Sequence, residues 1–295
     1  MLMDRQYMAE ENQPQQLRFI VDGIEFKAQA WGNPKDFPML ALHGWLDNSA
    51  SFFALAPKLN DVYLVALDMA GHGQSAHRHG SAPYNIWEDV AEIFDIADQL
   101  GWDRFALLGH SRGAIIATLA AGTFPERISH VALIEGILPE IMRAEDTPEQ
   151  LAFSIKSLKK QSTKPLSVYV DMNAAILARE NGMFPLGPLA AKALTDRGVV
   201  AVENGFCWST DKRLLAPSAI KLLPDQMAAF IRRITAPIHL ILAEDGMPKL
   251  FPPYLSAVQQ FPQISLDLIA GGHHLHMEQE VDCVADIFNS FLANR

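Results

Sequence analysis

A serine between two glycines is the feature of this sequence that most directly suggests chemistry: the run GHSRG occupies residues 109–113. A mostly apolar run, residues 104–108, precedes it, and an alanine-rich apolar run, residues 114–121, follows it. A strand, a sharp turn and a helix in that order form the context in which a G-x-S-x-G sequence exposes a nucleophilic serine. The glycines leave room for a strained turn, and a helix N-terminus favours the negative charge that develops on an attacking oxygen. We therefore predict that Ser111 is a nucleophile; the alternative is a serine that only caps a helix.

A serine hydroxyl is a poor nucleophile at neutral pH, so Ser111 requires a base, and that base requires an orienting carboxylate. His273 lies in the run GGHHLHME at residues 271–278, which follows the last predicted strand and would bring the imidazole back over the sheet. His274 and His276 are rivals on residue type alone. A metal site is another interpretation of this cluster, but His-His-x-His has no carboxylate or cysteine at a convincing spacing. We therefore expect no metal ion here.

Attack of a serine on a carbonyl group also needs N–H donors for the oxyanion that forms. One donor would be the backbone amide of Arg112, the residue after the nucleophile; for the other we choose Trp45, beside His43 and Gly44 in the loop after the third strand. The Arg112 side chain could bind a substrate carboxylate, but we favour a salt bridge to a neighbouring acid, since a buried guanidinium almost requires a carboxylate. Five aromatic side chains could line an apolar acyl pocket or pack in the core: Trp45, Trp87, Trp208, Phe52 and Phe153.

The elements that must position these residues alternate between strands and helices. Strands are predicted at residues 17–21, 24–31, 38–42, 62–67, 104–108, 128–134, 237–243 and 264–270. Helices are predicted at residues 49–59, 84–100, 114–121, 224–234 and 252–261, with a last helix ending at residue 292. The strand at 62–67 is apolar throughout, which suits a sheet covered on both faces. The alternation predicts right-handed βαβ units on a mostly parallel sheet.

Residues 138–224 interrupt that alternation. A capping box with a proline in the first turn, residues 147–150, opens a helix there. The other elements expected in this stretch are helices at 168–179 and 189–197 and a small hairpin around Asn204-Gly205. We predict a helical cap inserted into a core made of residues 1–137 and 225–295; the alternative is an inert packing layer.

Composition narrows the class of protein. The chain has 295 residues, 49% of them hydrophobic and 20% charged, with no run of 18 apolar residues and no apolar signal-peptide core near its start. These features predict a cytoplasmic protein, in whose reducing compartment Cys207 and Cys283 are expected to stay unpaired. A net charge of −10 argues against nucleic acid or an anionic membrane as a partner, because both need a basic face. A homo-oligomer is compatible with all of these features.

Three loops that follow predicted strands carry a resemblance to a known family. They are HGWLDN at residues 43–48 with Ser51-Phe52, Asp68 with GHGQS at 71–75, and GHSRG at 109–113. With these loops the chain resembles an α/β-hydrolase from end to end, and more closely the serine hydrolase-like proteins. The resemblance implies the α/β-hydrolase fold: a mostly parallel central sheet flanked by helices, with an inserted and mainly helical cap. It also implies a Ser, acid, His triad and no cofactor.

Two details refine that resemblance. The layout is also similar to the haloalkane dehalogenases, but those use an aspartate nucleophile followed by tryptophan, so Ser111-Arg112 counts against dehalogenation. In the superfamily the base is followed five positions later by a glutamate. His273 with Glu278 fits that register, which favours His273 over its neighbours.

The acid departs from the pattern of most relatives. They carry it in a G-x-x-D turn after the strand that follows the cap, whereas AEDG at residues 243–246 puts Gly246 in the aspartate's place. Asp245 is displaced by one residue, and at a strand end one residue turns a side chain to the opposite side. Glu135 ends the strand after the elbow helix, where dehalogenase-like relatives are similar in having an acid; it could instead pair with a nearby arginine. We predict Glu135 as the orienting acid, with Asp245 as the alternative.

The function predicted from these residues is a serine hydrolase that cleaves an ester, thioester or lactone of a small, largely apolar acid. Ser111 would attack and form an acyl-enzyme, while His273 first takes and then returns the proton. The expected partner is therefore a small-molecule ester-type substrate. Two alternatives remain: other chemistry at the same site, such as carbon–carbon bond hydrolysis, perhydrolysis or a cofactor-free oxygenase reaction, or a ligand-binding protein on a hydrolase scaffold.

Overall fold

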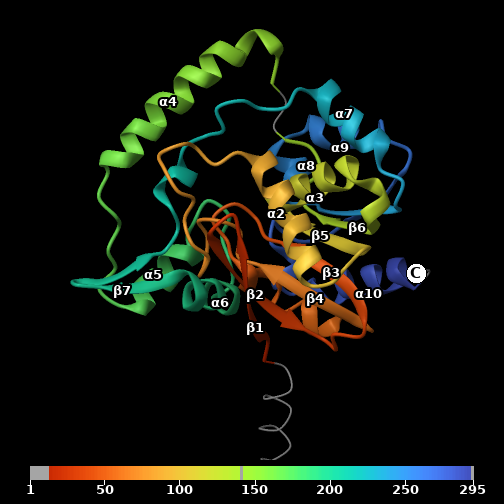
Figure 1. Cartoon of the computed structure of the whole chain (residues 1–295), viewed down its shortest axis with the longest axis horizontal. Helices are drawn as coiled ribbons and strands as arrows, with labels where there is room; N and C mark the ends of the chain where they lie inside the picture. Colours follow the sequence, from red (N-terminus) through yellow and green to blue (C-terminus); the bar gives the residue numbers. More distant parts are fainter. Residues whose placement is uncertain (1–12, 140–141, 294–295) are drawn as a thin grey trace, which may run out of the picture.

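The computed structural model describes residues 13–139 and 142–293, and its centre is an eight-stranded sheet (Figure 1). The strands are β1 (Gln15–Val21), β2 (Ile24–Trp31), β3 (Phe37–Leu42), β4 (Val62–Leu67), β5 (Phe105–His110), β6 (Ile128–Ile134), β9 (Ile238–Ala243) and β10 (Ile264–Ile269). Their order is β1-β2-β4-β3-β5-β6-β9-β10. β1 pairs antiparallel with β2, and β2 with β4, while all the other neighbours are parallel. The predicted mostly parallel sheet is confirmed.

Helices cover both faces of this sheet. They are α2 (Ile86–Gln99), α3 (Arg112–Thr123), α7 (Pro224–Arg233), α8 (Met247–Leu250), α9 (Pro253–Val258) and α10 (Val281–Leu292). Successive side chains of a strand point to opposite faces, so each strand contributes to two cores. Leu40 and Leu42 of β3 belong to the core that includes α2, α3, α7 and α9, whereas Met39 and Ala41 belong to the core that includes α10. The predicted arrangement of helices flanking the sheet is therefore confirmed.

The single helix expected at residues 49–59 is wrong. Two short 3₁₀ helices stand there instead, η1 (Ser49–Phe52) and η2 (Ala56–Lys58). Pro57 lies within η2, and a proline in a helix interior removes a hydrogen bond and clashes with the preceding turn. The helical periodicity of the apolar residues is real, but the chain cannot continue as one α-helix through this proline.

Residues 142–224, here called the inserted segment, lie between β6 and α7. The segment contains α4 (Thr147–Thr163), α5 (Met172–Glu180), α6 (Pro188–Gly198), the hairpin of β7 (Val199–Val202) and β8 (Gly205–Trp208), and η5 (Lys212–Leu215). α5 begins later than expected because Asp171 caps it, accepting a hydrogen bond from the Ala174 amide at 2.8 Å. α6 packs on the core, since Ala191 and Leu194 share a hydrophobic cluster with Ala50 of η1. α4, by contrast, runs along the edge of the molecule, apart from the sheet (Figure 1).

The two cysteines are both unpaired, as predicted: Cys207 is buried on β8 and Cys283 is exposed on α10.

Among the helices in the described parts of the chain, none combines the length and the hydropathy that crossing a membrane requires. The longest run of helix, α4, has only one buried residue, Ser154.

Candidate active site

Ser111 stands at a sharp turn between β5 and α3. Its backbone has φ 52° and ψ −117°, a conformation that residues other than glycine rarely adopt. Its amide donates to the carbonyl oxygen of Ile134 at 2.9 Å, which fixes the turn to the neighbouring strand β6. A side chain on Gly113 would overlap the backbone of Leu42 at the end of β3, so α3 can begin this close to the sheet only with glycine at that position. The turn thus has the strand, strained serine and helix of a nucleophile elbow.

Ser111, His273 and Glu135 form one continuous series of hydrogen bonds. His273 Nε2 lies 3.0 Å from Ser111 Oγ, and His273 Nδ1 lies 2.9 Å from Glu135 Oε2. A carboxylate only accepts hydrogen bonds, so Nδ1 of the neutral ring carries the proton and Nε2 is left to accept the proton of the serine hydroxyl. That tautomer is the one a general base needs beside a serine.

Glu135 is fully buried at the end of β6, with its carboxylate against the loop that follows β9. The backbone amides of Ala243 and Met247 donate to its two oxygens, each at 2.7 Å. A Cβ atom on Gly246 would overlap this carboxylate. A side chain at 246 and a carboxylate from 135 therefore exclude each other, and glycine at 246 is what leaves room for Glu135 beside His273.

Asp245, the alternative acid, faces away from this site. Its side chain is 66% exposed and forms an ion pair with Lys249 at 2.7 Å. Its backbone amide donates to the carbonyl oxygen of Gly271 at 3.0 Å. The structure therefore brings Glu135, rather than Asp245, to the imidazole of His273.

The three histidines of the run HHLH have three different partners. His273 faces the serine, His274 Nε2 lies 3.3 Å from Asp47 Oδ2, and His276 Nε2 lies 2.9 Å from Ser51 Oγ. Their side chains do not converge on a common point. His-His-x-His is therefore not a metal-binding set in this fold, and its first member alone reaches Ser111.

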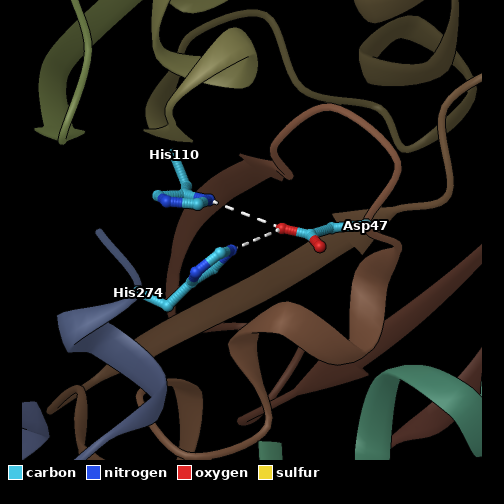
Figure 2. A group of neighbouring side chains, drawn as sticks. All are labelled: Asp47, His110 and His274. Carbon is cyan, nitrogen blue, oxygen red and sulfur yellow. Dashed lines mark hydrogen bonds and ion pairs between the residues drawn. The ribbon is translucent and has the colours of Figure 1, made fainter. Parts of the chain in front are cut away.

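A buried cluster that the sequence analysis missed joins Asp47, His110 and His274 (Figure 2). One nitrogen or oxygen atom of each lies within 4.8 Å of the others, a spacing at which a metal ion could be held. However, Arg179 of α5 donates to Asp47 Oδ1 at 2.7 Å, so a guanidinium already neutralises the carboxylate. His110 Nε2–H donates to the backbone carbonyl of His273 at 2.9 Å. The cluster thus supports the loop that carries the base, and a metal ion is not needed to explain it.

Burial determines the protonation of this cluster. It lowers the pKa of His110 and of His274, so both rings are neutral near pH 7. Burial also opposes ionisation of Asp47, but the hydrogen bond from His274 and the positive charge of Arg179 outweigh it and hold the pKa of this carboxyl well below its usual range. The result is one carboxylate–guanidinium pair flanked by two neutral imidazoles.

The two residues chosen as oxyanion donors lie at the start of α3 and in the loop after β3. Arg112 is the first residue of α3, and the first amides of a helix have no partner within it. Trp45 lies in the loop after β3, and its indole Nε1–H donates to the carbonyl oxygen of Leu214 at 2.8 Å, which ties this loop to the inserted segment. The Arg112 side chain forms the predicted salt bridge, with Asp89 of α2 at 2.7 Å.

Known proteins resemble this chain in both sequence and fold. The family described as the α/β-hydrolase fold matches residues 38–166. The serine hydrolase-like protein of Homo sapiens is 38% identical over 148 residues, which cover 49% of this chain and 72% of that protein. The chain belongs to the α/β-hydrolase family. Serine hydrolase-like protein 2 of Homo sapiens is 29% identical over 94% of this chain and 93% of its own length.

Solved structures of other α/β-hydrolases extend the likeness to the whole fold. A hypothetical protein from Pseudomonas aeruginosa PAO1 is 40% identical, with a TM-score of 0.90 over 95% of this chain and 99% of its own. The thioesterase domain from the curacin biosynthetic pathway has a TM-score of 0.80 at 23% identity, covering 93% of this chain and 99% of that domain. At that identity the thioesterase shares the fold alone.

In this α/β-hydrolase the inserted segment contacts the base directly. The ring of Phe184 stacks on the imidazole of His273, with centroids 4.2 Å apart and planes at 29°. Arg179 uses one nitrogen for Asp47 and another for the carbonyl oxygen of Phe184, at 3.3 Å. The sequence analysis missed Arg179 and Phe184, because they carry no motif and lie far along the chain from Asp47 and His273, the residues of the core that they contact.

Two pockets open between the inserted segment and the hydrolase core. The first has a volume of about 290 Å³ and is lined by mostly apolar side chains, among them Trp45, Tyr169, Phe184, Trp208 and Leu215. The second, of about 550 Å³, is lined by residues that include Trp45, Tyr84, Arg112, Phe153 and Met183. Trp45, Met183 and Leu215 line both. Ser111 is not a lining residue of either pocket, so the pockets border the site through Trp45, Arg112 and the ring of Phe184.

The five aromatic residues singled out from the sequence lie in different environments in the structure. Trp45, Trp208 and Phe153 line one or both pockets. Phe52 is completely buried in the core and packs near His276, so it lines no pocket. Trp87 is 44% exposed and lines neither pocket. Aromatic type alone could not separate these roles, because packing and ligand contact call for the same side chains.

Proposed function

We propose that this α/β-hydrolase is a serine hydrolase that cleaves an ester, thioester or lactone of a small, largely apolar acid. The observation that carries the proposal is the hydrogen-bonded series from Ser111 through His273 to Glu135, with distances of 3.0 and 2.9 Å. Such a series can activate a serine hydroxyl at neutral pH, because the base has a free acceptor nitrogen and a buried carboxylate behind it.

The mechanism uses each of these groups twice. Ser111 Oγ attacks the substrate's carbonyl carbon while His273 Nε2 takes the hydroxyl proton, and the carboxylate of Glu135 stabilises the imidazolium that results. The backbone amides of Arg112 and Trp45 stabilise the tetrahedral oxyanion. The oxyanion collapses, the bond to the leaving group breaks, and His273 returns the proton to that group. Water, activated by the same imidazole, then cleaves the acyl-enzyme and releases the acid.

We propose further that residues 138–224 form a cap over a core of residues 1–137 and 225–295. Phe184 on His273 and Trp45 bonded to Leu214 support this division, because these contacts join the inserted segment to the loop that carries His273 and to the loop after β3. The pockets between the segment and the core would hold the acyl part of the substrate, since their walls are mainly apolar. Substitutions on these walls should therefore change acyl-chain preference more than stability.

The direct test is a series of p-nitrophenyl esters of increasing acyl length, assayed with the wild-type protein and with Ser111→Ala. We expect a burst of nitrophenol stoichiometric with the protein, and labelling of Ser111 by a fluorophosphonate probe. Both signals should vanish in Ser111→Ala. A matched control is Ser129→Ala, a serine on β6 that is not part of the hydrogen-bonded series and should keep the labelling.

The outcome also separates the proposal from its rivals. If no ester is cleaved faster by the wild type than by Ser111→Ala, the esterase proposal fails. Binding of esters without a burst would then indicate a ligand-binding protein on a hydrolase scaffold. Fluorophosphonate labelling without ester turnover would indicate an activated serine that serves another reaction.

A further inference from the structure

The cations that line the two pockets fall into two groups. Arg179, Arg112 and Arg213 each form an ion pair with a buried or mostly buried carboxylate: Asp47, Asp89 and Asp211 respectively, at 2.6 to 2.7 Å. The positive charges of these three side chains are therefore already used by the fold. The remaining cations, Lys164 and Lys212, both line the first pocket.

These two lysines have no carboxylate partner within residues 13–139 and 142–293. Lys212 Nζ donates to the backbone carbonyl of Lys164 at 2.8 Å, which places the Lys212 ammonium beside the segment that carries the second lysine. No aspartate or glutamate is among the lining residues of the first pocket. The chain as a whole has 34 acidic and 24 basic residues, so a pocket lining with lysines and no acidic residue differs from the average composition.

The rest of the pocket wall is suited to an apolar group. Tyr169, Trp208 and Leu215 line it, and Phe184 connects it to the base. A ligand that fills this pocket would thus meet aromatic and aliphatic surface near His273 and two lysines, Lys164 and Lys212, whose charges are not paired with a carboxylate in the described chain. Placing an anionic group beside those ammonium groups would be favourable, whereas a second apolar group there would gain little.

We infer that the substrate of this site is an amphipathic anion: an ester or thioester with an apolar body and a carboxylate or phosphate group that Lys164 and Lys212 bind. The inference rests on the proposed serine hydrolase function and specifies its substrate class. The pocket borders the site on the side of Trp45 and Phe184, and this position does not fix which half of the ester enters it. The anionic group therefore sits either at the far end of the acyl chain or on the leaving group. In either case the reaction is ordinary hydrolysis, with one ester bond and one water consumed and an acid and an alcohol or thiol released.

Two pairs of esters test the inference and its two versions. For the acyl chain, p-nitrophenyl hexanoate is compared with the mono-p-nitrophenyl ester of adipic acid, which has the same length and a terminal carboxylate. For the leaving group, p-nitrophenyl butyrate is compared with 3-carboxy-4-nitrophenyl butyrate. We expect the wild type to prefer the anionic member of one pair in kcat/KM, and that preference to shrink as salt is raised.

The lysine variants make the test specific. In the double variant Lys164→Gln with Lys212→Gln, the ratio of kcat/KM for the anionic ester over the neutral ester should fall about ten-fold, as expected for losing two partly exposed charge contacts. Lys164→Arg with Lys212→Arg should keep most of the ratio. Lys159→Gln with Lys160→Gln is the matched control, because it also removes two positive charges, at positions of α4 that do not line the pocket, and it should leave the ratio unchanged.

A binding measurement keeps the inference testable apart from catalysis. Adipamate and hexanamide are uncleaved amides of equal chain length that differ only in the carboxylate, and their binding to Ser111→Ala can be followed by tryptophan fluorescence, since Trp45 and Trp208 line the pocket. We expect adipamate to bind more tightly, and the difference to disappear in the double glutamine variant. Equal binding of the two amides, or a ratio of kcat/KM that the lysine variants do not change, overturns the inference even if neutral esters are hydrolysed. If the wild type hydrolyses no ester while Ser111→Ala still binds adipamate more tightly than hexanamide, the proposed hydrolase function is overturned and the preference for an anionic ligand is not.

Discussion

Two helices of this hydrolase, α3 and α4, differ sharply in how the protein holds them. α3 follows Ser111, and nine of its 12 residues are buried. α4, in the inserted segment, has 17 residues and buries only Ser154, while Leu151, Phe153 and Ile155 are exposed. The helix that begins after Ser111 is thus embedded in the core, and the helix beside the pockets has few buried contacts. The proposed reaction needs fixed distances and would take place where packing is tight, whereas the proposed acyl-chain preference would depend on the loosely packed segment.

The largest effect on kcat should come from a substitution of Glu135, the acid of the proposed triad. Glu135→Gln should lower kcat by roughly 10²–10⁴, because an amide can neither hold the productive tautomer of His273 nor stabilise its imidazolium. Asp245→Asn should cost much less, since Asp245 is exposed and pairs with Lys249. Steady-state kinetics on the best ester of the chain-length series gives both numbers. The reverse ranking of the two variants would show that the acid is wrongly assigned.

The contrast between α3 and α4 predicts a second difference, in stability. Leu119 of α3 is 2% exposed, so Leu119→Ala should lower the free energy of unfolding by about 2–5 kcal/mol. Leu151 of α4 is 41% exposed, and Leu151→Ala should change the free energy of unfolding by less than about 0.5 kcal/mol. Urea denaturation of the two variants, which remove the same atoms, measures both effects. Similar losses in the two would mean that α4 is held more firmly than its burial indicates.

Acid should weaken the core, because all ten histidines of the chain lie there, outside residues 142–224. Burial lowers the pKa of His43, His72, His110 and His274 below 6.5, and lowers the pKa of His276 to about 3. An unfolded chain binds these protons near pH 6.5, whereas the folded core binds them only at lower pH. Stability is therefore fully present above about pH 6.5 and is lost as the pH falls toward 3, by about 1.4 kcal/mol for each unit of pKa difference.

Thermal unfolding between pH 8 and pH 4 measures this loss. His276→Gln removes one buried titrating group while keeping a polar partner for Ser51, so its melting temperature should fall less steeply with pH than that of the wild type. His79→Gln, at an exposed position, should leave the slope unchanged. Parallel slopes for the wild type and His276→Gln would contradict the buried-histidine explanation.

The smallest effect should come from Phe184, the side chain of the inserted segment that stacks on His273. Phe184→Leu keeps an apolar wall but removes the ring that stacks on His273. An aromatic face favours a cation by about 0.5–2 kcal/mol, so kcat should fall by roughly two- to thirty-fold as the imidazolium loses that support. Phe184→Tyr retains the ring and should retain most of kcat. If leucine and tyrosine at this position are equivalent in kcat, the stacking contributes nothing to the reaction.

Much of the fold follows from local pattern. Every strand of the central sheet lies within two residues of its expected bounds, because strands such as β4 are apolar throughout and because the antiparallel pair β1 and β2 flanks the turn signal Asp22-Gly23. The turn at Ser111 was also predictable, since both its conformation and the glycines it requires are properties of five consecutive residues. The exception, residues 49–59, shows the limit: apolar periodicity predicted one helix, while Pro57 produced two short turns.

What the sequence determined by itself was therefore the order of most elements, the serine at the sharp turn and the loop that carries His273. The sequence predicted Glu135 with Asp245 as the alternative, and only the tertiary structure shows which of the two carboxylates lies against His273, because that depends on the space at Gly246, more than 100 residues from Glu135. The same holds for Arg179 on Asp47 and Phe184 on His273. The physical reason is range: hydrogen bonding along the backbone and side-chain periodicity act over a few residues and leave a pattern in the sequence. A contact between distant segments depends on how the whole chain packs and leaves no local signal.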